Sequence, residues 1–224
     1  MTTRTIVAIS GGLNKPSSTR LLTDRLVEAA VSELKARGVQ AQVEVVELRD
    51  HAHDTVNAML SGFPSGDLKG VLERLAAADG VIAVSPIYTT GASGLFKSFV
   101  DIIEKEALTG MPVLLGATGG TARHSLALEY AIRPMFTYLR TDVVTTAVFV
   151  ATDDWSGQAD DVNPLPARIS RAGRELAELV AARDETPGRP VRRRPLLRGD
   201  VLQTLSNAQP RSVPAAGALS HREW

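Results

Sequence analysis

Three consecutive hydroxyl side chains, Ser17, Ser18 and Thr19, open a segment with helical periodicity and follow the pair Gly11-Gly12. The first N–H groups of a helix have no partner inside the helix, and the helix dipole favours an anion beside them. Hydroxyls placed there can donate hydrogen bonds to phosphate oxygens. A single serine would more simply cap the helix. Three hydroxyls after a glycine-rich turn favour a phosphate-binding loop at residues 10–20.

The better-known phosphate-binding fingerprints do not occur in this sequence. No G-x-G-x-x-G follows the first apolar run, which argues against a dinucleotide site of the Rossmann type. No G-x-x-x-x-G-K-[ST] occurs either, because Gly94 is not adjacent to Lys97. A hydroxyl-lined loop without a P-loop lysine fits a terminal monophosphate, such as that of FMN.

A second loop, within Ser85–Asp101, follows the apolar run Val81–Val84 and leads into an amphipathic helix. In an open parallel sheet, ligands bind beyond the carboxyl ends of the central strands. Pro86 restricts the backbone, the glycines permit unusual backbone angles, and Tyr88 offers an aromatic face. These features suit a flat ring that forms hydrogen bonds better than they suit a nucleophile.

A third loop, Ala117–His124, follows the next apolar run along the chain. Gly119 and Gly120 allow backbone amides to approach a ligand closely. Two roles stay open for His124: a polar contact to a ligand carbonyl or a substrate, and a plain capping or interface role. The sequence indicates no acid or base partner for it.

The elements that must position these loops alternate between strand and helix. Short apolar runs predict strands, and apolar residues at helical spacing predict helices. We expect strands at 5–10, 43–48, 81–84, 111–117 and 143–151, and helices at 21–37, 68–78, 94–107, 124–139 and 167–183. The rest of the polar stretch 49–70 carries no assignment. The alternation predicts a doubly wound parallel sheet.

The composition excludes several kinds of site. The 224 residues include no cysteine, which removes thiolate catalysis, disulfides and cysteine-based metal sites. His51 and His53 give only two ligands, so no metal is expected. The formal net charge is zero, so the chain as a whole does not attract nucleic acid or an anionic membrane. No apolar run has the length of a membrane span and no signal peptide is evident, which predicts a cytoplasmic protein.

The composition changes near residue 184. Residues 185–224 hold five of the 12 prolines and seven arginines against three acids. We therefore expect one domain over residues 1–184 and a Pro/Arg-rich tail over residues 185–224 that is disordered or loosely docked.

The run PIYTTGASGLFKSFVDIIEKEAL at 86–108, with ATGGTARHSLALEYAIRP at 117–134, resembles the NAD(P)H-dependent FMN reductases. The resemblance is strongest to the reductase components that supply reduced flavin to alkanesulfonate-type monooxygenases. It implies a flavodoxin-like three-layer α/β sandwich with a five-stranded parallel sheet of order 2-1-3-4-5. It also implies a homodimer or homotetramer and a flavin-dependent monooxygenase as partner.

The same resemblance assigns binding residues for FMN. The phosphate would meet Ser10, Ser17, Ser18 and Thr19; the ring would meet Pro86, Ile87, Tyr88 and Thr89; the polar edge of the ring would meet Thr118, Gly119 and Gly120. Hydride would pass from NADPH or NADH to the flavin, so no catalytic side chain is expected. The donor stays open, with Lys15, Arg20 and Arg123 as the cations that could meet a 2′-phosphate.

Two other functions stay open. A reductase that keeps FMN bound and reduces quinones or azo compounds would use the same three loops. A flavodoxin-like electron carrier is less favoured, because such carriers tend to be strongly acidic and this chain is neutral.

Pro134 predicts an interruption in the helix expected at 124–139. Its ring crowds the carbonyl group of Tyr130, four residues earlier, and it has no N–H to donate. A kink or π-bulge is therefore expected. In the resembling reductases a π-bulge at such an aromatic residue lies at a subunit interface near the flavin. Tyr130 is thus either an oligomer contact or a core tyrosine before a helix break.

Overall fold

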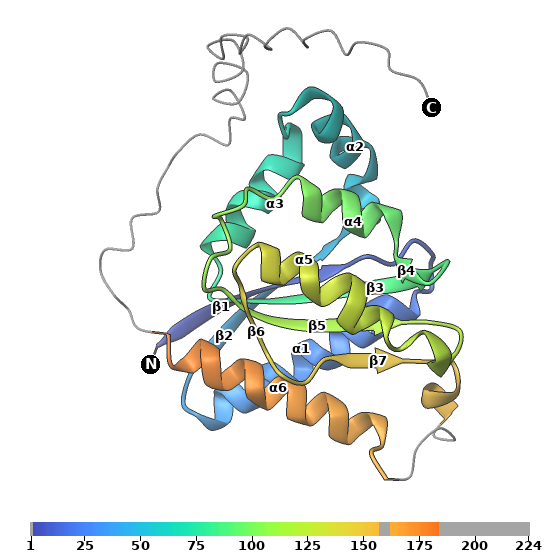
Figure 1. Ribbon diagram of the computed structural model, residues 1–224. Helices are drawn as coiled ribbons and strands as arrows, with labels where there is room; N and C mark the ends of the chain where they lie inside the picture. Colours follow the sequence, from blue (N-terminus) through green and yellow to red (C-terminus); the bar gives the residue numbers. More distant parts are fainter. Residues whose placement is uncertain (1, 157–161, 184–224) are drawn as a thin grey trace, which may run out of the picture. The chain divides into compact units, whose positions relative to one another are not determined.

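The computed structural model describes residues 2–156 and 162–183, and within them seven strands form one sheet between two layers of helices (Figure 1). The strands are β1 (Thr3–Ser10), β2 (Gln40–Glu47), β3 (Gly80–Tyr88), β4 (Gly91–Ala92), β5 (Pro112–Thr118), β6 (Asp142–Val143) and β7 (Val148–Val150). The α-helices are α1 (Ser18–Ala36), α2 (Ala52–Ser61), α3 (Gly66–Ala77), α4 (Gly94–Asp101), α5 (Arg133–Tyr138) and α6 (Leu165–Ala181). The expected three-layer α/β sandwich is confirmed.

The sheet order is β2-β1-β3-β5-β6, with β4 antiparallel to β3 and β7 parallel to β5. The prediction of five strands in the order 2-1-3-4-5 is therefore wrong in strand number. One reason is that the chain after β3 turns back at once and adds β4. The other is that the expected strand at 143–151 is divided into β6 and β7.

Side chains interrupt that last strand. Arg133 donates hydrogen bonds to the carbonyl groups of Val144 and Thr145, at 3.1 and 3.2 Å. The backbone N–H of Thr146 donates to Glu175 Oε2 at 2.7 Å. These side chains satisfy backbone groups that a continuous strand would pair with the sheet. The chain then rejoins the sheet where Val148 pairs with Gly116 of β5.

β3 extends four residues further than the apolar run predicts. Ser85 and Pro86 pair in parallel register with Ala117 and Thr118 of β5. The prediction of a loop from Ser85 onward is thus wrong for residues 85–88, which belong to the strand. Tyr88 stands at the strand's carboxyl end as a result.

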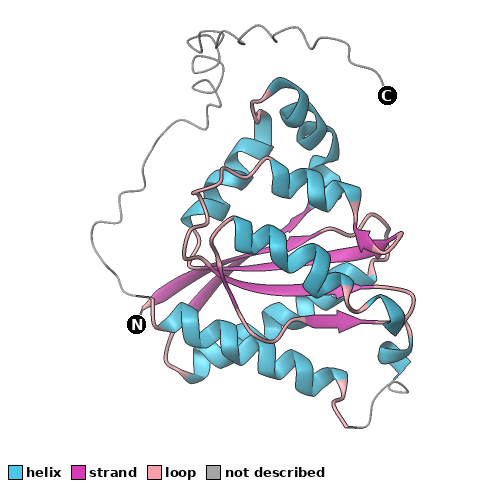
Figure 2. Cartoon of the chain, in the orientation of Figure 1, coloured by secondary structure: helices cyan, strands magenta, loops and turns pink. Residues whose placement is uncertain are grey.

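The core lies on both faces of the sheet, as the alternation of side chains along a strand requires. Ile6 and Ala8 of β1 join the apolar cluster beneath α1 and α6. Val7 and Ile9 join the cluster beneath α3, α4 and α5. Figure 2 shows helices covering both faces of the magenta sheet. Burial on both faces explains why the central strands read as continuous apolar runs.

Several helix predictions change at their ends. The unassigned stretch after β2 contains a 3₁₀ turn (Leu48–His51), then α2 and the start of α3. α4 ends at Asp101 and does not continue to residue 107 as expected. Its last turn is closed by i→i−3 hydrogen bonds from the N–H groups of Ile102 and Ile103. The helix expected at 124–139 is in fact a 3₁₀ turn (Ala122–His124), a π-helix (Leu128–Ile132) and α5.

The π-helix confirms the interruption predicted from Pro134. The backbone N–H of Arg133 donates to Leu128, five residues earlier, and Pro134 has no N–H with which to continue the α-helical ladder.

None of the helices found in residues 2–156 and 162–183 is long and apolar enough to cross a membrane. The tail expected at 185–224, and so the domain boundary before it, lies outside the residues described.

Candidate functional site

The three predicted loops meet at the carboxyl ends of β1, β3 and β5, where they surround a pocket of about 250 Å³. Nine of the eleven predicted residues line it: Ser17, Ser18, Thr19, Pro86, Ile87, Tyr88, Thr118, Gly119 and Gly120. Five further residues complete the lining: Gly12, Leu13, Asn14, Pro16 and Thr152. Ser10 and Thr89 are not part of the lining. The sheet order brings together segments as far apart in the sequence as Gly12 and Thr152.

The first loop is closely packed around Gly12. A Cβ built on Gly12 would lie 2.1 Å from Ser17 Oγ, so any other residue there would displace the Ser17 hydroxyl from this position. Ser17 is the N-cap of α1, and its Oγ accepts a hydrogen bond from the N–H of Arg20 at 3.2 Å. The capping role and a phosphate-binding role are compatible, because the hydroxyl keeps its own hydrogen to donate.

Ser10 lies beneath this loop at the end of β1. It is 1% exposed, and its Oγ has no hydrogen-bond partner. Ile6 and Ala8 face α1, so the alternation of the strand directs Ser10 to the same side. A buried hydroxyl without a partner costs about 1–3 kcal/mol, which an anionic oxygen at the start of α1 would offset. This unpaired group and the glycine cradle fit a phosphate.

The first and third loops are joined by side chains. The hydroxyl groups of Thr19 and Thr118 lie 2.8 Å apart, and both residues are buried. Only one of the two hydroxyls donates in this pair. The other keeps a hydrogen that it can donate to a ligand.

The end of β3 presents Tyr88 beside the pocket. Pro86 and Ile87 are buried, whereas the Tyr88 side chain is 44% exposed. Thr89 and Thr90 form the two-residue turn between β3 and β4, with φ angles of 48° and 68°. Such angles suit the right-handed twist of a hairpin but are costly for β-branched residues. The turn therefore stores backbone strain next to the exposed tyrosine.

The third loop keeps its backbone open to a ligand. Gly119 donates its N–H to the carbonyl of Val150 at 2.9 Å, and a Cβ there would lie 2.9 Å from the Phe149 ring. A Cβ on Gly120 would meet no atom within 4 Å. Gly119 thus fixes the loop against β7, and Gly120 leaves its backbone accessible. His124 is half-buried in the turn that follows, and no side-chain partner of it is recorded among residues 2–156 and 162–183.

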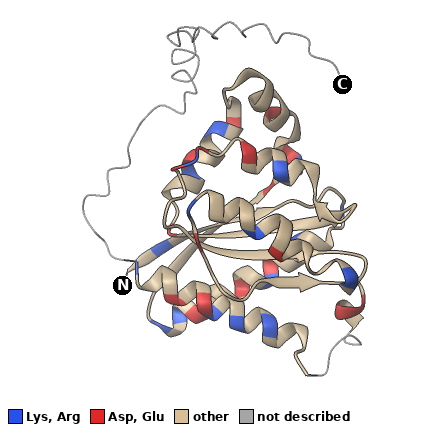
Figure 3. Ribbon diagram, in the orientation of Figure 1, with Lys and Arg blue, Asp and Glu red and all other residues tan. Residues whose placement is uncertain are grey.

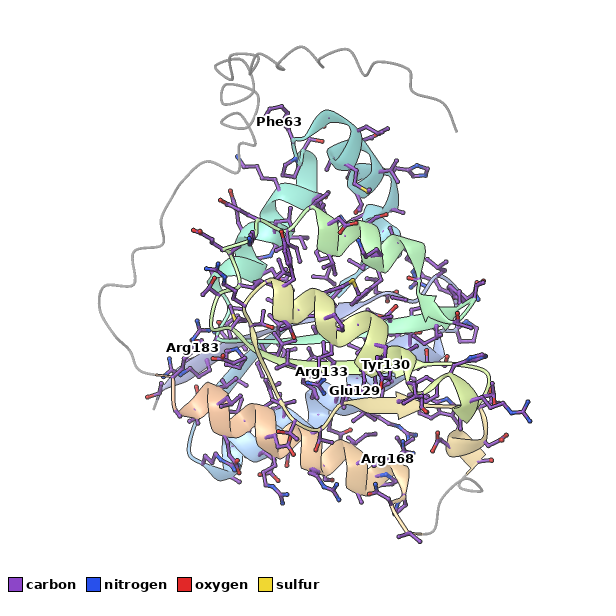
Figure 4. The ribbon with its side chains drawn as sticks, in the orientation of Figure 1. Phe63, Glu129, Tyr130, Arg133, Arg168 and Arg183 are labelled. Carbon is purple, nitrogen blue, oxygen red and sulfur yellow. The ribbon has the colours of Figure 1, made fainter. Side chains whose placement is uncertain are left out.

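Thr152 follows β7 and is a lining residue that the sequence reasoning missed. Asp154 holds this turn: its Oδ2 accepts the N–H of Ala151 at 2.7 Å, and its Oδ1 pairs with Arg168 of α6. Arg168 also donates to the carbonyl of Phe149 at 2.6 Å (Figure 4). The rule that found the other loops, polar residues just after a strand, also applies to Thr152.

Of the cations considered for a 2′-phosphate, Arg20 is already engaged. Its guanidinium binds Asp24 at 2.8 Å and Glu47 at 2.7 Å. The hydrogen bond to Asp24 is the main cause that raises the pKa of Arg20 above its usual value, although partial burial opposes it. Lys15 and Arg123 remain exposed.

A larger concavity of about 470 Å³ lies along β2 and α3. Its lining is mostly polar, and its arginines are paired, Arg74 with Glu44 and Arg20 with Glu47. Figure 3 shows both basic and acidic positions along α3. The lining holds four acids against two arginines and no Phe, Tyr or Trp. This concavity therefore suits a flavin and its phosphate less well than the pocket beside Tyr88 does.

Tyr130 lies in the π-helix and is 79% exposed, so the interpretation as a core tyrosine is wrong. The π-helix contacts β4 and β5, which places it beside the hairpin of the pocket. Glu129 and Arg133, in an i,i+4 ion pair, bracket the helical interruption on either side of Tyr130 (Figure 4). No group of three or more His, Asp or Glu among the residues that the structure covers could hold a metal ion.

The chain is similar to known flavin reductases. Residues 4–156 match the family model described as NADPH-dependent FMN reductase. An FMN reductase (NADPH) of Pseudomonas aeruginosa is 34% identical over 180 residues, which cover 80% of this chain and 94% of that protein. The NADH-dependent FMN reductase SfnF of Pseudomonas fluorescens is 32% identical over 174 residues, covering 78% of this chain and 90% of that protein.

Solved structures agree with the fold. The crystal structure of an oxidoreductase from Corynebacterium diphtheriae is 39% identical, covers 82% of this chain and all of that chain, and has a TM-score of 0.77. A flavodoxin from the domain Archaea, 16% identical with a TM-score of 0.51 over 79% of this chain and 98% of that chain, shows the flavodoxin-like fold alone. On the matched 153 residues and these identities, the chain belongs to the NADPH-dependent FMN reductase family.

Proposed function

We propose that this protein is an NAD(P)H-dependent FMN reductase whose flavin binds in the pocket between the three loops. The observation that carries the proposal is the phosphate cradle at the start of α1. It combines the unpaired buried hydroxyl of Ser10 with a Gly12 that has no room for a side chain. Membership of the family supplies the reaction class.

Different residues would bind different parts of the flavin. Ser10, Ser17, Ser18 and Thr19 would hold the phosphate, with the N–H groups of α1 aligned toward it. Pro86, Ile87 and Tyr88 would line the ring, with Thr89 beside them in the hairpin turn, and Thr118, Gly119 and Gly120 would meet its polar edge. Bound FMN would supply the hydride-accepting centre, opposite the nicotinamide of the donor. The chain binds and orients; no side chain is assigned as acid or base.

The wider role follows from the resemblance. Reduced FMN would pass to a flavin-dependent monooxygenase in the cytoplasm, and the reductase would act as a homodimer or homotetramer. The exposed Tyr130 beside the flavin hairpin supports a subunit contact there. One relative is named as NADPH-dependent and another as NADH-dependent, so the hydride donor of this protein has to be determined by experiment.

Steady-state oxidation of NADPH and of NADH by the purified protein, with and without added FMN, tests the proposal. We expect oxidation that requires FMN, saturates with it, and is weaker with riboflavin, which lacks the phosphate. Turnover that needs an added quinone while FMN copurifies would favour a quinone or azo reductase instead. No oxidation of either nicotinamide under any of these conditions would contradict the reductase function.

A further inference from the structure

Arg49 reaches from the end of β2 to the phosphate-binding loop, 35 residues earlier in the sequence. Its Nη1 donates a hydrogen bond to the carbonyl of Asn14 at 2.7 Å, and its side chain is only 15% exposed. Asn14 lines the pocket. The guanidinium therefore holds the middle of the loop from outside the pocket.

Glu47 connects this arginine to the other end of the loop. One of its carboxylate oxygens pairs with Arg49, and the other accepts Arg20 Nη1 at 2.7 Å. Arg20 in turn donates its backbone N–H to Ser17 Oγ, the N-cap of α1. The Glu47 carboxylate, 16% exposed, thus links Arg49, which tethers Asn14, with Arg20, which follows the three hydroxyl residues.

The loop is anchored at its start, where the N–H of Gly11 donates to the carbonyl of Val84 at 2.8 Å, but its middle has little else to hold it. Leu13, Asn14, Lys15 and Pro16 are all exposed, so they contribute little apolar packing. A loop without packing must be held by hydrogen bonds if it is to present its donors in one arrangement. Holding the donors in place before binding reduces the entropy that a ligand's phosphate must offset.

We propose that Arg49 is a positioning residue for the phosphate-binding loop and that it thereby sets the preference of this protein for FMN over riboflavin. The inference rests on the proposed function, because it assumes that the loop binds the flavin phosphate. A purely structural role for Arg49 would weaken the binding of both flavins alike. Loss of Arg49 affects the phosphate and leaves the binding of the ring unchanged.

The test compares the dissociation constants for FMN and for riboflavin, measured by quenching of flavin fluorescence. Arg49→Met keeps an unbranched apolar stem as far as the position of Nε but removes the guanidinium, with its charge and donors. We expect this variant to bind FMN about tenfold more weakly, because it loses one charge-assisted hydrogen bond and its ion pair. Its affinity for riboflavin should be unchanged within about twofold. Arg49→Lys has one donor group for two acceptors. Its dissociation constant for FMN should lie between that of the original protein and that of Arg49→Met.

Arg74→Met is the matched control. Arg74 also pairs with a glutamate of β2, at 2.7 Å from Glu44, but it lies on α3 and makes no recorded contact with the loop. We expect this variant to bind both flavins as the original protein does. Glu47→Gln keeps the volume of the linking side chain and weakens both ion pairs, so it should reproduce the FMN-specific loss if Arg49→Met does not fold.

Equal weakening of FMN and riboflavin in the Arg49 variants, or no weakening of either, would overturn the inference and leave the reductase function standing. If the original protein binds neither flavin, the proposed function itself is wrong. The same titrations therefore distinguish the two failures.

Discussion

The hydroxyl groups of Thr19 and Thr118 lie 2.8 Å apart although the two residues are separated by 99 positions in the sequence. Thr19 opens α1 after β1, and Thr118 ends β5. Because β3 lies between β1 and β5 in the sheet, this contact closes the pocket beyond the end of β3. The pair therefore sets the separation of the loop that binds the phosphate from the loop that meets the polar edge of the ring.

That contact predicts a coupled effect on stability. Thr19→Val or Thr118→Val leaves the other hydroxyl buried without a partner, and each should lower the free energy of unfolding by about 1–3 kcal/mol. The double variant should cost less than the sum of the two, since it removes both polar groups. Urea denaturation of the four proteins gives the coupling. Strict additivity would show that the two hydroxyls do not interact.

Gly12→Ala should damage flavin binding. Its Cβ would meet Ser17 Oγ at 2.1 Å, so the Ser17 hydroxyl has to leave the position in which it caps α1 and faces the pocket. We expect FMN to bind at least about tenfold more weakly while the far-ultraviolet circular dichroism is unchanged. Gly94→Ala is the control, because a Cβ there meets no atom within 4 Å and Gly94 does not line the pocket. Equal affinities in the two variants would mean that the loop is not the phosphate site.

The turn at Thr89 and Thr90 should be a place where the protein can be stabilised. Both have positive φ, which costs a residue with a Cβ about 1–2 kcal/mol, and Asn-Gly is the pair that this hairpin prefers. The double change Thr89→Asn, Thr90→Gly should raise the free energy of unfolding by about 1 kcal/mol and the Tm by a few degrees. Thr90→Ala should gain less, because it keeps a Cβ. A fall in Tm for the Asn-Gly variant would contradict the strain.

Tyr130→Ala should change the oligomeric state rather than the stability of the subunit. The side chain is 79% exposed, so it buries little area within one chain. Light scattering after size exclusion should show a smaller species than the original protein forms. Tyr138→Ala, at a second exposed tyrosine of the same region, 65% exposed, is the control and should keep the original mass. An unchanged mass in Tyr130→Ala would remove Tyr130 from the interface.

Much of the fold follows from local patterns in the sequence. The central strands are buried on both faces and read as apolar runs, and the polar residues after them mark one edge of the sheet. The same rule collects Ser17, Tyr88 and Gly119 around one pocket. The interruption at the π-helix can be predicted from Pro134 alone, because the missing N–H belongs to that residue and does not depend on distant partners.

Other features depend on partners that are distant in the sequence. β3 continues to Tyr88 because β5 pairs with Ser85 and Pro86 and β4 pairs with Ile87 and Tyr88. The register with β5 is invisible in either segment alone. The last strand divides where Arg133 and Glu175 bind its backbone. The contact from Arg49 to Asn14 likewise requires the sheet to be assembled first. Long-range polar contacts are thus the part that sequence patterns miss.

The most direct test of the account is a crystal structure of the protein with FMN bound. We expect the phosphate within hydrogen-bond distance of Ser17, Ser18 and Thr19 and the flavin ring against the end of β3 at Tyr88. FMN in the concavity along β2 and α3, or a pocket that stays empty at saturating FMN, would contradict it.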